Sequence, residues 1–293
     1  MIIDGVFSGG GIKGFALVGA VQVMEEQGFV FKQSAGTSAG SIIAALLIAG
    51  YTGEEMKEIL NETNIEELLD PRRILPIPFV KWLMLYRKMG LFKGDALEKW
   101  IAAKLAKRGI VTFGDIPYQS LRIIVSDITN GQLAVLPDDL DKYGVNPLEF
   151  PVAKAVRMSC SIPYFFEPVK LKWRQSSSLF VDGGILSNFP MWLFETEEGK
   201  KTRPVIGMNL RGDGLGKKVD EINNAVEMFA ALFKTMRDAH DSRYISKKVA
   251  QNILFIPMTG ISATDFHLTE DNKEMLVERG RKCAETFLKN WTY

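Results

Sequence analysis

The sequence predicts an α/β fold in which helices flank both faces of a central, mostly parallel sheet. Two successive patterns of strand, turn and helix indicate it. A strand pattern at 2–7 leads through a glycine-rich turn into a helical pattern at 15–27, and an apolar run at 29–31 leads through a second turn into a helical run at 42–49. Consecutive units of this kind form parallel strands joined by right-handed crossovers. Both turns are therefore expected at the same edge of the sheet.

The composition is that of one sizeable domain without a strong charge bias. The chain has 293 residues and 46% hydrophobic content, so we expect 1–293 to form a single domain, with 211–293 as its C-terminal helical part. Lys and Arg number 36, against 35 Asp and Glu. Because this balance gives no electrostatic footprint for nucleic acid, no nucleic-acid partner is expected.

The number of cysteines and the hydropathy of the chain narrow the class of protein further. Only Cys160 and Cys283 occur, too few for a disulfide framework or a zinc site, and both are expected to be small buried hydrophobic residues. We expect no metal and no other cofactor. The sequence shows no signal-peptide pattern and no apolar run long enough to span a bilayer. We therefore expect a cytoplasmic protein, with peripheral contact to a membrane left open.

Turn and capping signals predict the remaining elements. A capping-box pattern begins a helix at Thr52, and Asp95 is expected to cap a long amphipathic helix. Asn130 and Gly131 predict a hairpin turn between two strands. Further helices are expected at 151–158, 219–239 and 269–290, and further strands at 121–128, 132–136, 165–173, 179–181, 204–210 and 253–257. A polar surface turn or a disordered tip is expected at 174–178.

The segment 65–94 differs from the rest of the chain. From residue 71 onward it combines three prolines, large apolar and aromatic residues, and interspersed Lys and Arg. An interfacial segment has this composition, because its apolar side chains enter the acyl region while its cations meet lipid phosphates. We therefore expect 65–94 to be a lid or a membrane-contact insertion. A bent helix packed on the core is the alternative.

The second turn holds a candidate nucleophile, Ser38, in the G-x-S-x-G element 36–40. A serine between a strand and a helix projects its hydroxyl from a tight turn, and the helix directs amide groups at developing negative charge. Gly36 and Gly40 flank Ser38 where side chains would crowd the turn. An ordinary turn of small residues before a buried helix remains the alternative.

The first turn, Gly9-Gly10-Gly11-Ile12-Lys13-Gly14, is a candidate anion cradle. Its glycines let backbone N–H groups converge beside a helix N-terminus. The same residues satisfy G-x-G-x-x-G, the dinucleotide fingerprint, which requires an acidic residue at the end of the second strand. The sequence at 31–35 has no acid. A cradle for a transient oxyanion is therefore favoured over a Rossmann-type dinucleotide-binding protein.

A serine hydroxyl needs a base to accept its proton, and the sequence offers several. Asp182 ends a strand-like run, and Asp127 ends another. His267 lies after the last strand and would complete a Ser-His-Asp triad of an α/β-hydrolase esterase. His240 lies in a charged helical stretch and is expected on a solvated face. Asp127 is as readily explained as the organiser of the Asn-Gly turn.

Three of these blocks together resemble the signature blocks of patatin-like phospholipases in order and spacing. They are the glycine block 9–14, the serine block 36–40 and Asp182-Gly183-Gly184. The segments 94–97, 112–115 and 161–166 are similar to weaker blocks of the same family. The resemblance covers about residues 3 to 210.

The resemblance implies hydrolysis of carboxylic esters in phospholipids or other acylglycerols by a Ser-Asp dyad without histidine. By position, Ser38 is the nucleophile and Asp182 is the base. The oxyanion hole and the supporting motif positions implied are Gly9, Gly10, Gly11 and Ala39, and Lys13, Gly14, Gly36, Gly40, Gly183 and Gly184. Lys13 stands where the family commonly has Arg. The implied partners are a lipid ester substrate and, transiently, a membrane surface, and the sequence points to no particular protein partner.

Overall fold

The computed structural model describes residues 1–70, 86–173, 176–194, 203–211, 250–258 and 269–292, together with six positions between 222 and 236. Predictions for 71–85, for most of the helix at 219–239, and for His240 and His267 lie outside the described residues. Among the described helices, none is both long enough and apolar enough to cross a lipid bilayer.

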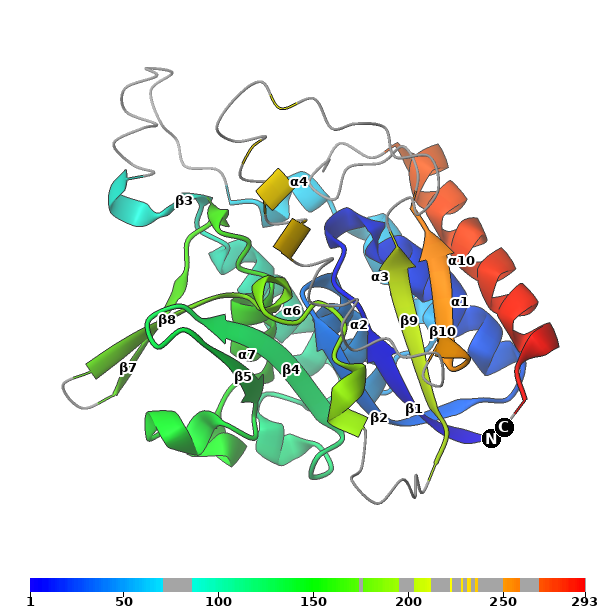
Figure 1. The fold of residues 1–293 in the computed structure, drawn as a ribbon, viewed down its shortest axis with the longest axis horizontal. Helices are drawn as coiled ribbons and strands as arrows, with labels where there is room; N and C mark the ends of the chain where they lie inside the picture. Colours follow the sequence, from blue (N-terminus) through cyan, green and yellow to red (C-terminus); the bar gives the residue numbers. More distant parts are fainter. Residues whose placement is uncertain are drawn as a thin grey trace.

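An eight-stranded sheet forms the centre of the molecule, in the order β10-β9-β1-β2-β4-β8-β7, with β5 also paired to β4 (Figure 1). β3 and β6 pair separately. The strands are β1 (Ile2–Phe7), β2 (Val30–Thr37), β3 (Gly90–Phe92), β4 (Leu121–Asp127), β5 (Gln132–Leu136), β6 (Tyr164–Phe166), β7 (Val169–Trp173), β8 (Ser176–Asp182), β9 (Val205–Arg211) and β10 (Ile253–Pro257).

The sheet changes character at β4. From β10 to β4 all neighbouring strands are parallel, as the two crossover units predict. Beyond β4 the pairings are antiparallel, with β5 returning through the turn at Asn130 and Gly131 and with β8 and β7 forming the other edge. The predicted central, mostly parallel sheet is confirmed, and it carries an antiparallel edge.

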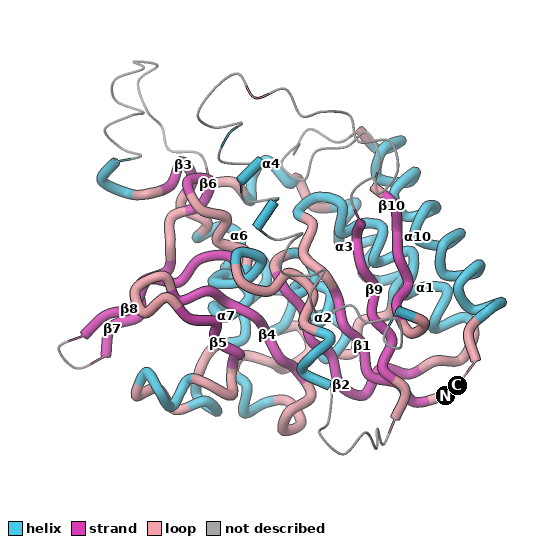
Figure 2. Tube along the Cα trace, viewed as in Figure 1, coloured by secondary structure: helices cyan, strands magenta, loops and turns pink. Residues whose placement is uncertain are grey.

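Helical segments cover both faces of this sheet, as predicted. The helices are α1 (Phe15–Glu26), α2 (Ala39–Ile48), α3 (Gly53–Glu62), α4 (Ile65–Leu68), α6 (Asp95–Ala106), α7 (Val152–Ser159) and α10 (Glu270–Asn290), and the short 3-10 helices are η1 (Gly11–Gly14), η2 (Phe113–Asp115), η3 (Leu140–Tyr143), η4 (Pro147–Glu149), η5 (Gly183–Ile185) and η6 (Met191–Phe194). Figure 2 shows how they surround the strands.

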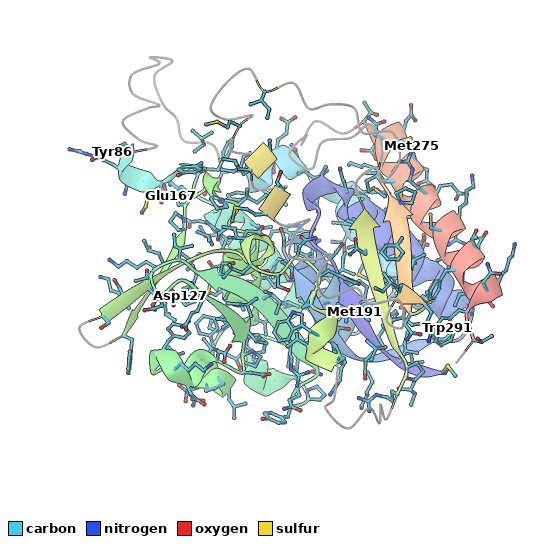
Figure 3. All side chains as sticks on the ribbon, in the orientation of Figure 1. Tyr86, Asp127, Glu167, Met191, Met275 and Trp291 are labelled. Carbon is cyan, nitrogen blue, oxygen red and sulfur yellow. The ribbon has the colours of Figure 1, made fainter. Side chains whose placement is uncertain are left out.

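The two faces differ in what they bury. Phe7, Ile123 and Ile206 face a main core shared with α1, α2, α6 and α7. On the opposite face a smaller cluster of Val6, Ala35 and neighbouring apolar residues includes Met191 of η6, which is labelled in Figure 3. Burial on both sides keeps the central strands rigid, which is the requirement for a site built at their ends.

Local differences from the sequence prediction have simple causes. The helix after Ser38 begins at Ala39 and not at 42, because β2 continues through Gly36 and Thr37. Gly94, with φ 79°, takes the N-cap position, so Asp95 is the first residue inside its helix. The predicted turn at 174–178 is wrong for 176–178, since these serines pair with β7 as the start of β8. The Thr52 capping box is present.

Candidate functional site

Ser38 lies at a strained turn between β2 and α2. Its backbone angles, φ 52° and ψ −125°, fall in a region that non-glycine residues adopt at a cost of about 1–3 kcal/mol, and only when the surroundings hold them there. Three hydrogen bonds hold Ser38 in this conformation. The Ser38 carbonyl accepts from the N–H and the hydroxyl of Ser41, at 2.8 and 2.6 Å, and the Ser38 N–H donates to Ser159 Oγ at 2.9 Å.

The glycine block lies beside this serine, as expected for two turns at one sheet edge. A Cβ added to Gly40 would lie 2.3 Å from the Phe7 carbonyl oxygen, so only glycine lets α2 begin against the end of β1. A Cβ added to Gly9 would lie 3.2 Å from Ser38 Cβ. The loop after β1 and the turn after β2 therefore form one wall of one site.

The backbone N–H groups of the glycine block are not equivalent. Gly9 donates its N–H to the carbonyl of Asn188 at 3.1 Å, so this amide is occupied. We therefore remove Gly9 from the expected oxyanion donors and regard it as structural. Among the residues that the structure describes, no hydrogen bond uses the N–H of Gly10, Gly11 or Ala39. Gly11 has φ 57°, which requires glycine at this turn.

Asp182 is a buried carboxylate at the end of β8. Its side chain accepts the Gly184 N–H at 2.8 Å, and the residue is 2% exposed. In the sheet register Thr37 pairs with Ile124, and the next residue of β4, Val125, pairs with Asp182. One strand thus separates Asp182 from the backbone at Ser38, a span of two strand spacings, or about 10 Å.

The segment 159–161 connects the two candidate catalytic residues. Ser159 accepts the Ser38 N–H, and the Ser161 carbonyl accepts the Asp182 N–H at 2.8 Å. Burial, with a further contribution from the negative charge of Asp182, raises the pKa of Cys160 to about 12. Cys160 is thus the small buried residue that the sequence predicts. It lies near enough to the Asp182 carboxylate for that charge to raise its pKa.

Arg157 fixes this segment from behind. It is 3% exposed, and its guanidinium donates to Ser161 Oγ and to the backbone carbonyls of Lys93 and Glu167. Burial lowers its pKa. Because these acceptors belong to three separate segments, Arg157 holds the end of β3, the end of β6 and the 159–161 turn together.

An apolar pocket reaches Ser38. It runs between the glycine loop, the first turn of α2, the α3–α4 region, α6 and the 160–166 segment, and its lining includes Ser38, Ile42, Leu60, Leu68, Trp100 and Phe166. Almost all of the lining side chains are hydrophobic, so the space suits a hydrocarbon chain and not a charged or sugar group. It differs in this respect from a nucleotide site.

The rival acid Asp127 has a structural role. It is fully buried and accepts hydrogen bonds from the N–H groups of Thr129 and Asn130, from the Asn130 side chain at 2.6 Å and from the Tyr143 hydroxyl at 3.0 Å. Asp127, labelled in Figure 3, is the last residue of β4 and pairs with Gln132 of β5 and Phe180 of β8. Its carboxylate organises the Asn-Gly turn, which was one of its two interpretations. His267 lies outside the described residues.

The sequence reasoning missed Ser159, Arg157 and Asn188 as site residues, and it included Ser161 only as part of the block 161–166. Each acts through a contact with residues far away in the chain, for example across 121 positions between Ser38 and Ser159. No local pattern marks such partners. Among the described residues, no group of three His, Cys, Asp or Glu side chains is arranged to hold a metal ion.

Ser38 is held in strain between a strand and a helix, beside a glycine-rich loop and an apolar pocket. This arrangement is similar to the strand-turn-helix element of α/β proteins that is called a nucleophile elbow. The family model for patatin-like phospholipases matches residues 5–194, about two thirds of the chain. The chain belongs to the patatin-like phospholipase family, which implies a lipid ester hydrolase and gives the dinucleotide-binding interpretation no support.

The chain is also similar to individual proteins and to solved structures. The chain is 55% identical to the uncharacterised protein YqhO of Bacillus subtilis over the full length of both. It is 26% identical to the probable lipid hydrolase 463L of Invertebrate iridescent virus 6, over 68% of this chain and 65% of that protein. The crystal structure of VipD from Legionella pneumophila matches 99% of this chain and 67% of its own, with 18% identity and a TM-score of 0.61, which shows a shared fold.

Proposed function

We propose that this protein hydrolyses carboxylic ester bonds of phospholipids or other acylglycerols, with Ser38 as nucleophile and Asp182 as base. The observation that carries the proposal is the apolar pocket at Ser38, because it offers a hydrocarbon chain a place beside the strained serine. The family and the probable lipid hydrolase among the relatives support the substrate class.

In the first step Ser38 Oγ attacks the ester carbonyl carbon while Asp182 accepts the hydroxyl proton. The carbonyl oxygen becomes an oxyanion, and the N–H groups of Gly10, Gly11 and Ala39 stabilise it. The bond to the alcohol then breaks, and the departing alcohol takes the proton from Asp182. The products of this half-reaction are the free alcohol and an acyl ester on Ser38.

In the second step water attacks the acyl-serine carbonyl and gives a proton to Asp182. The Ser38–acyl bond breaks, Ser38 Oγ recovers that proton, and the fatty acid leaves. Aspartate is a weak base, so much of the rate enhancement must come from the preorganised donors. Loss of one such donor typically lowers the rate by about 10²–10³.

Transient contact with a membrane surface is part of the proposal. Within the described part of 65–94, Tyr86 is 85% exposed, and Met89 and Leu91 are also exposed, next to the cations Arg87 and Lys88. Exposed aromatic and aliphatic side chains with basic neighbours suit the interface of an anionic bilayer. At the start of the same segment, α4 contributes Ile65 and Leu68 to the pocket wall, which supports the expectation that 65–94 is a lid.

The test compares Ser38→Ala, Asp182→Asn and His267→Ala on phospholipid vesicles and on a soluble short-chain ester. The dyad predicts that the Ser38 and Asp182 variants lose turnover on both substrates while the His267 variant keeps it. Loss of turnover in His267→Ala with activity retained in Asp182→Asn would replace the dyad with a triad. Tyr86→Ser should reduce vesicle hydrolysis and spare the soluble ester if the membrane contact is real.

A further inference from the structure

The wall of the Ser38 pocket supplied by α6 contains a tryptophan, Trp100, held in one orientation. Its indole N–H donates to Thr63 Oγ1 at 3.0 Å, and the Thr63 hydroxyl donates to the Ile59 carbonyl at 2.5 Å. Thr63 is the C-cap of α3 and lies two residues before α4. The indole is therefore fixed to the joint between these two helices.

We propose that Trp100 is a specificity-determining residue that limits the length and shape of the acyl chain which the pocket accepts. This inference rests on the proposed function and deepens it. The neighbouring pocket lining from α3 and α4 is aliphatic, namely Leu60, Ile65 and Leu68, and such side chains can change rotamer to fit a ligand. A planar indole anchored by a hydrogen bond cannot move aside without losing that bond.

The size of the expected effect follows from the burial of methylene groups. Each CH₂ that moves from water into an apolar pocket contributes about 0.8 kcal/mol. At about 1.4 kcal/mol per tenfold change in rate, each CH₂ raises kcat/KM roughly fourfold until the chain meets an obstruction. If Trp100 is that obstruction, its removal extends the rise to longer chains and leaves the shortest esters unaffected, because a two-carbon acyl group fills little of the pocket.

Thr63 makes a second variant informative. Thr63→Val keeps the size of the side chain and removes the acceptor for the indole, so the ring stays in the pocket but loses its anchor. Trp100→Phe keeps an aromatic ring and removes the donor. Both variants should broaden the chain-length profile less than Trp100→Ala, which removes the ring. A measurable broadening in Thr63→Val distinguishes an anchored wall from a merely bulky one, because a ring that acts by bulk alone would leave the profile of that variant unchanged.

Trp291→Ala is the matched control, because it removes the same side chain at a distance from the pocket. Trp291 packs on Phe29 and Phe287 near the C-terminus, and Figure 3 shows it on the side of the molecule away from α4. Trp291 lines no part of the pocket. Its variant should lower stability without changing the order of preferred esters.

The experiment measures kcat/KM for p-nitrophenyl esters with saturated chains from acetate to palmitate. In Trp100→Ala the optimum should move to longer chains by two carbons or more, with acetate hydrolysis within about fourfold of wild type, the range that one CH₂ spans. An unchanged profile in Trp100→Ala, or the same shift in Trp291→Ala, would overturn the inference.

Binding separates this inference from the proposed function. Displacement of a fluorescent fatty acid by saturated fatty acids of increasing length is measured in the Ser38→Ala background, with and without Trp100→Ala. If the wild type hydrolyses no ester, the proposed function fails, yet tighter binding of longer chains in the Trp100 variant still supports the pocket assignment. Absence of fatty-acid binding, or identical length dependence in both proteins, overturns the assignment.

Discussion

Replacing Ser159 by alanine tests how the strained nucleophile is held. The Ser159 hydroxyl is fully buried, accepts the Ser38 N–H at 2.9 Å and donates to the Ile124 carbonyl at 2.6 Å. Alanine leaves the Ser38 N–H without an acceptor, and an unsatisfied buried donor costs about 1–3 kcal/mol. The free energy of unfolding should fall by about that amount, measured by urea denaturation.

Activity should fall as well, because the lost bond also restrains φ 52° at Ser38. Once the turn relaxes, Ser38 Oγ no longer points at the substrate, and a loss of about 10- to 100-fold in kcat corresponds to about 1.4–2.7 kcal/mol of transition-state stabilisation. KM for a short soluble ester should change much less, since the pocket walls stay in place.

Ser161→Ala is the matched control. Ser161 is equally buried, and its hydroxyl bonds to Arg157 and not to Ser38. Its backbone carbonyl, which receives the Asp182 N–H, remains in the variant. Ser161→Ala should therefore lose stability and keep most of kcat. If Ser159→Ala loses stability but retains wild-type kcat, the hydroxyl only supports the fold and the reasoning about the turn is wrong.

Three further changes have clear expected outcomes. Asp127→Asn should destabilise the chain by about 1–3 kcal/mol, since it disturbs a buried acceptor of four hydrogen bonds, while ester hydrolysis continues in the folded fraction; complete loss of kcat in a folded variant would restore Asp127 as a catalytic acid. Burial raises the pKa of Cys160 from 9.0 to about 12, so the folded chain holds this proton more tightly than the unfolded chain does. The free energy of unfolding should therefore decrease between pH 9 and pH 12. Urea titrations of Cys160→Ala should lack the part of this decrease that Cys160 causes. Gly40→Ala would place a Cβ 2.3 Å from the Phe7 carbonyl oxygen and should yield little folded protein in circular dichroism; normal folding would contradict the close approach of β1 and α2.

The sequence predicted a structural feature correctly where the residues that determine this feature are neighbours in the chain. The turn at Ser38 could be predicted because its glycines, its serine and the flanking hydrophobic runs are neighbours in the chain. The same holds for the hairpin after Asp127, which depends on an Asn-Gly pair and forms as expected. Local conformational preference determines both the turn at Ser38 and the hairpin after Asp127.

Other features depend on contacts that no local pattern records. Gly9 belongs to the glycine block, yet Asn188, far along the chain, occupies its N–H. The polar run after residue 174 looked like a turn, but pairing with β7 makes Ser176–Ser178 a strand, since tertiary pairing overrides weak β-propensity. Trp100 lies in the amphipathic helix predicted after Asp95, but only its bond to Thr63 and its place on the pocket wall suggest the role in selectivity that we propose.

The change of direction at β4 has a consequence for how activity arises during folding. The parallel half of the sheet supplies Ser38, and the proposed base lies on β8, which follows the hairpin and α7 in the chain and pairs with β4 in the antiparallel part of the sheet. A chain in which only the strands before β8 have paired would hold the proposed nucleophile without the proposed base, and we expect it to hydrolyse no ester. In a refolding experiment ester hydrolysis should return with the final phase of recovery, and an earlier return would show that β8 docks before the rest of the sheet.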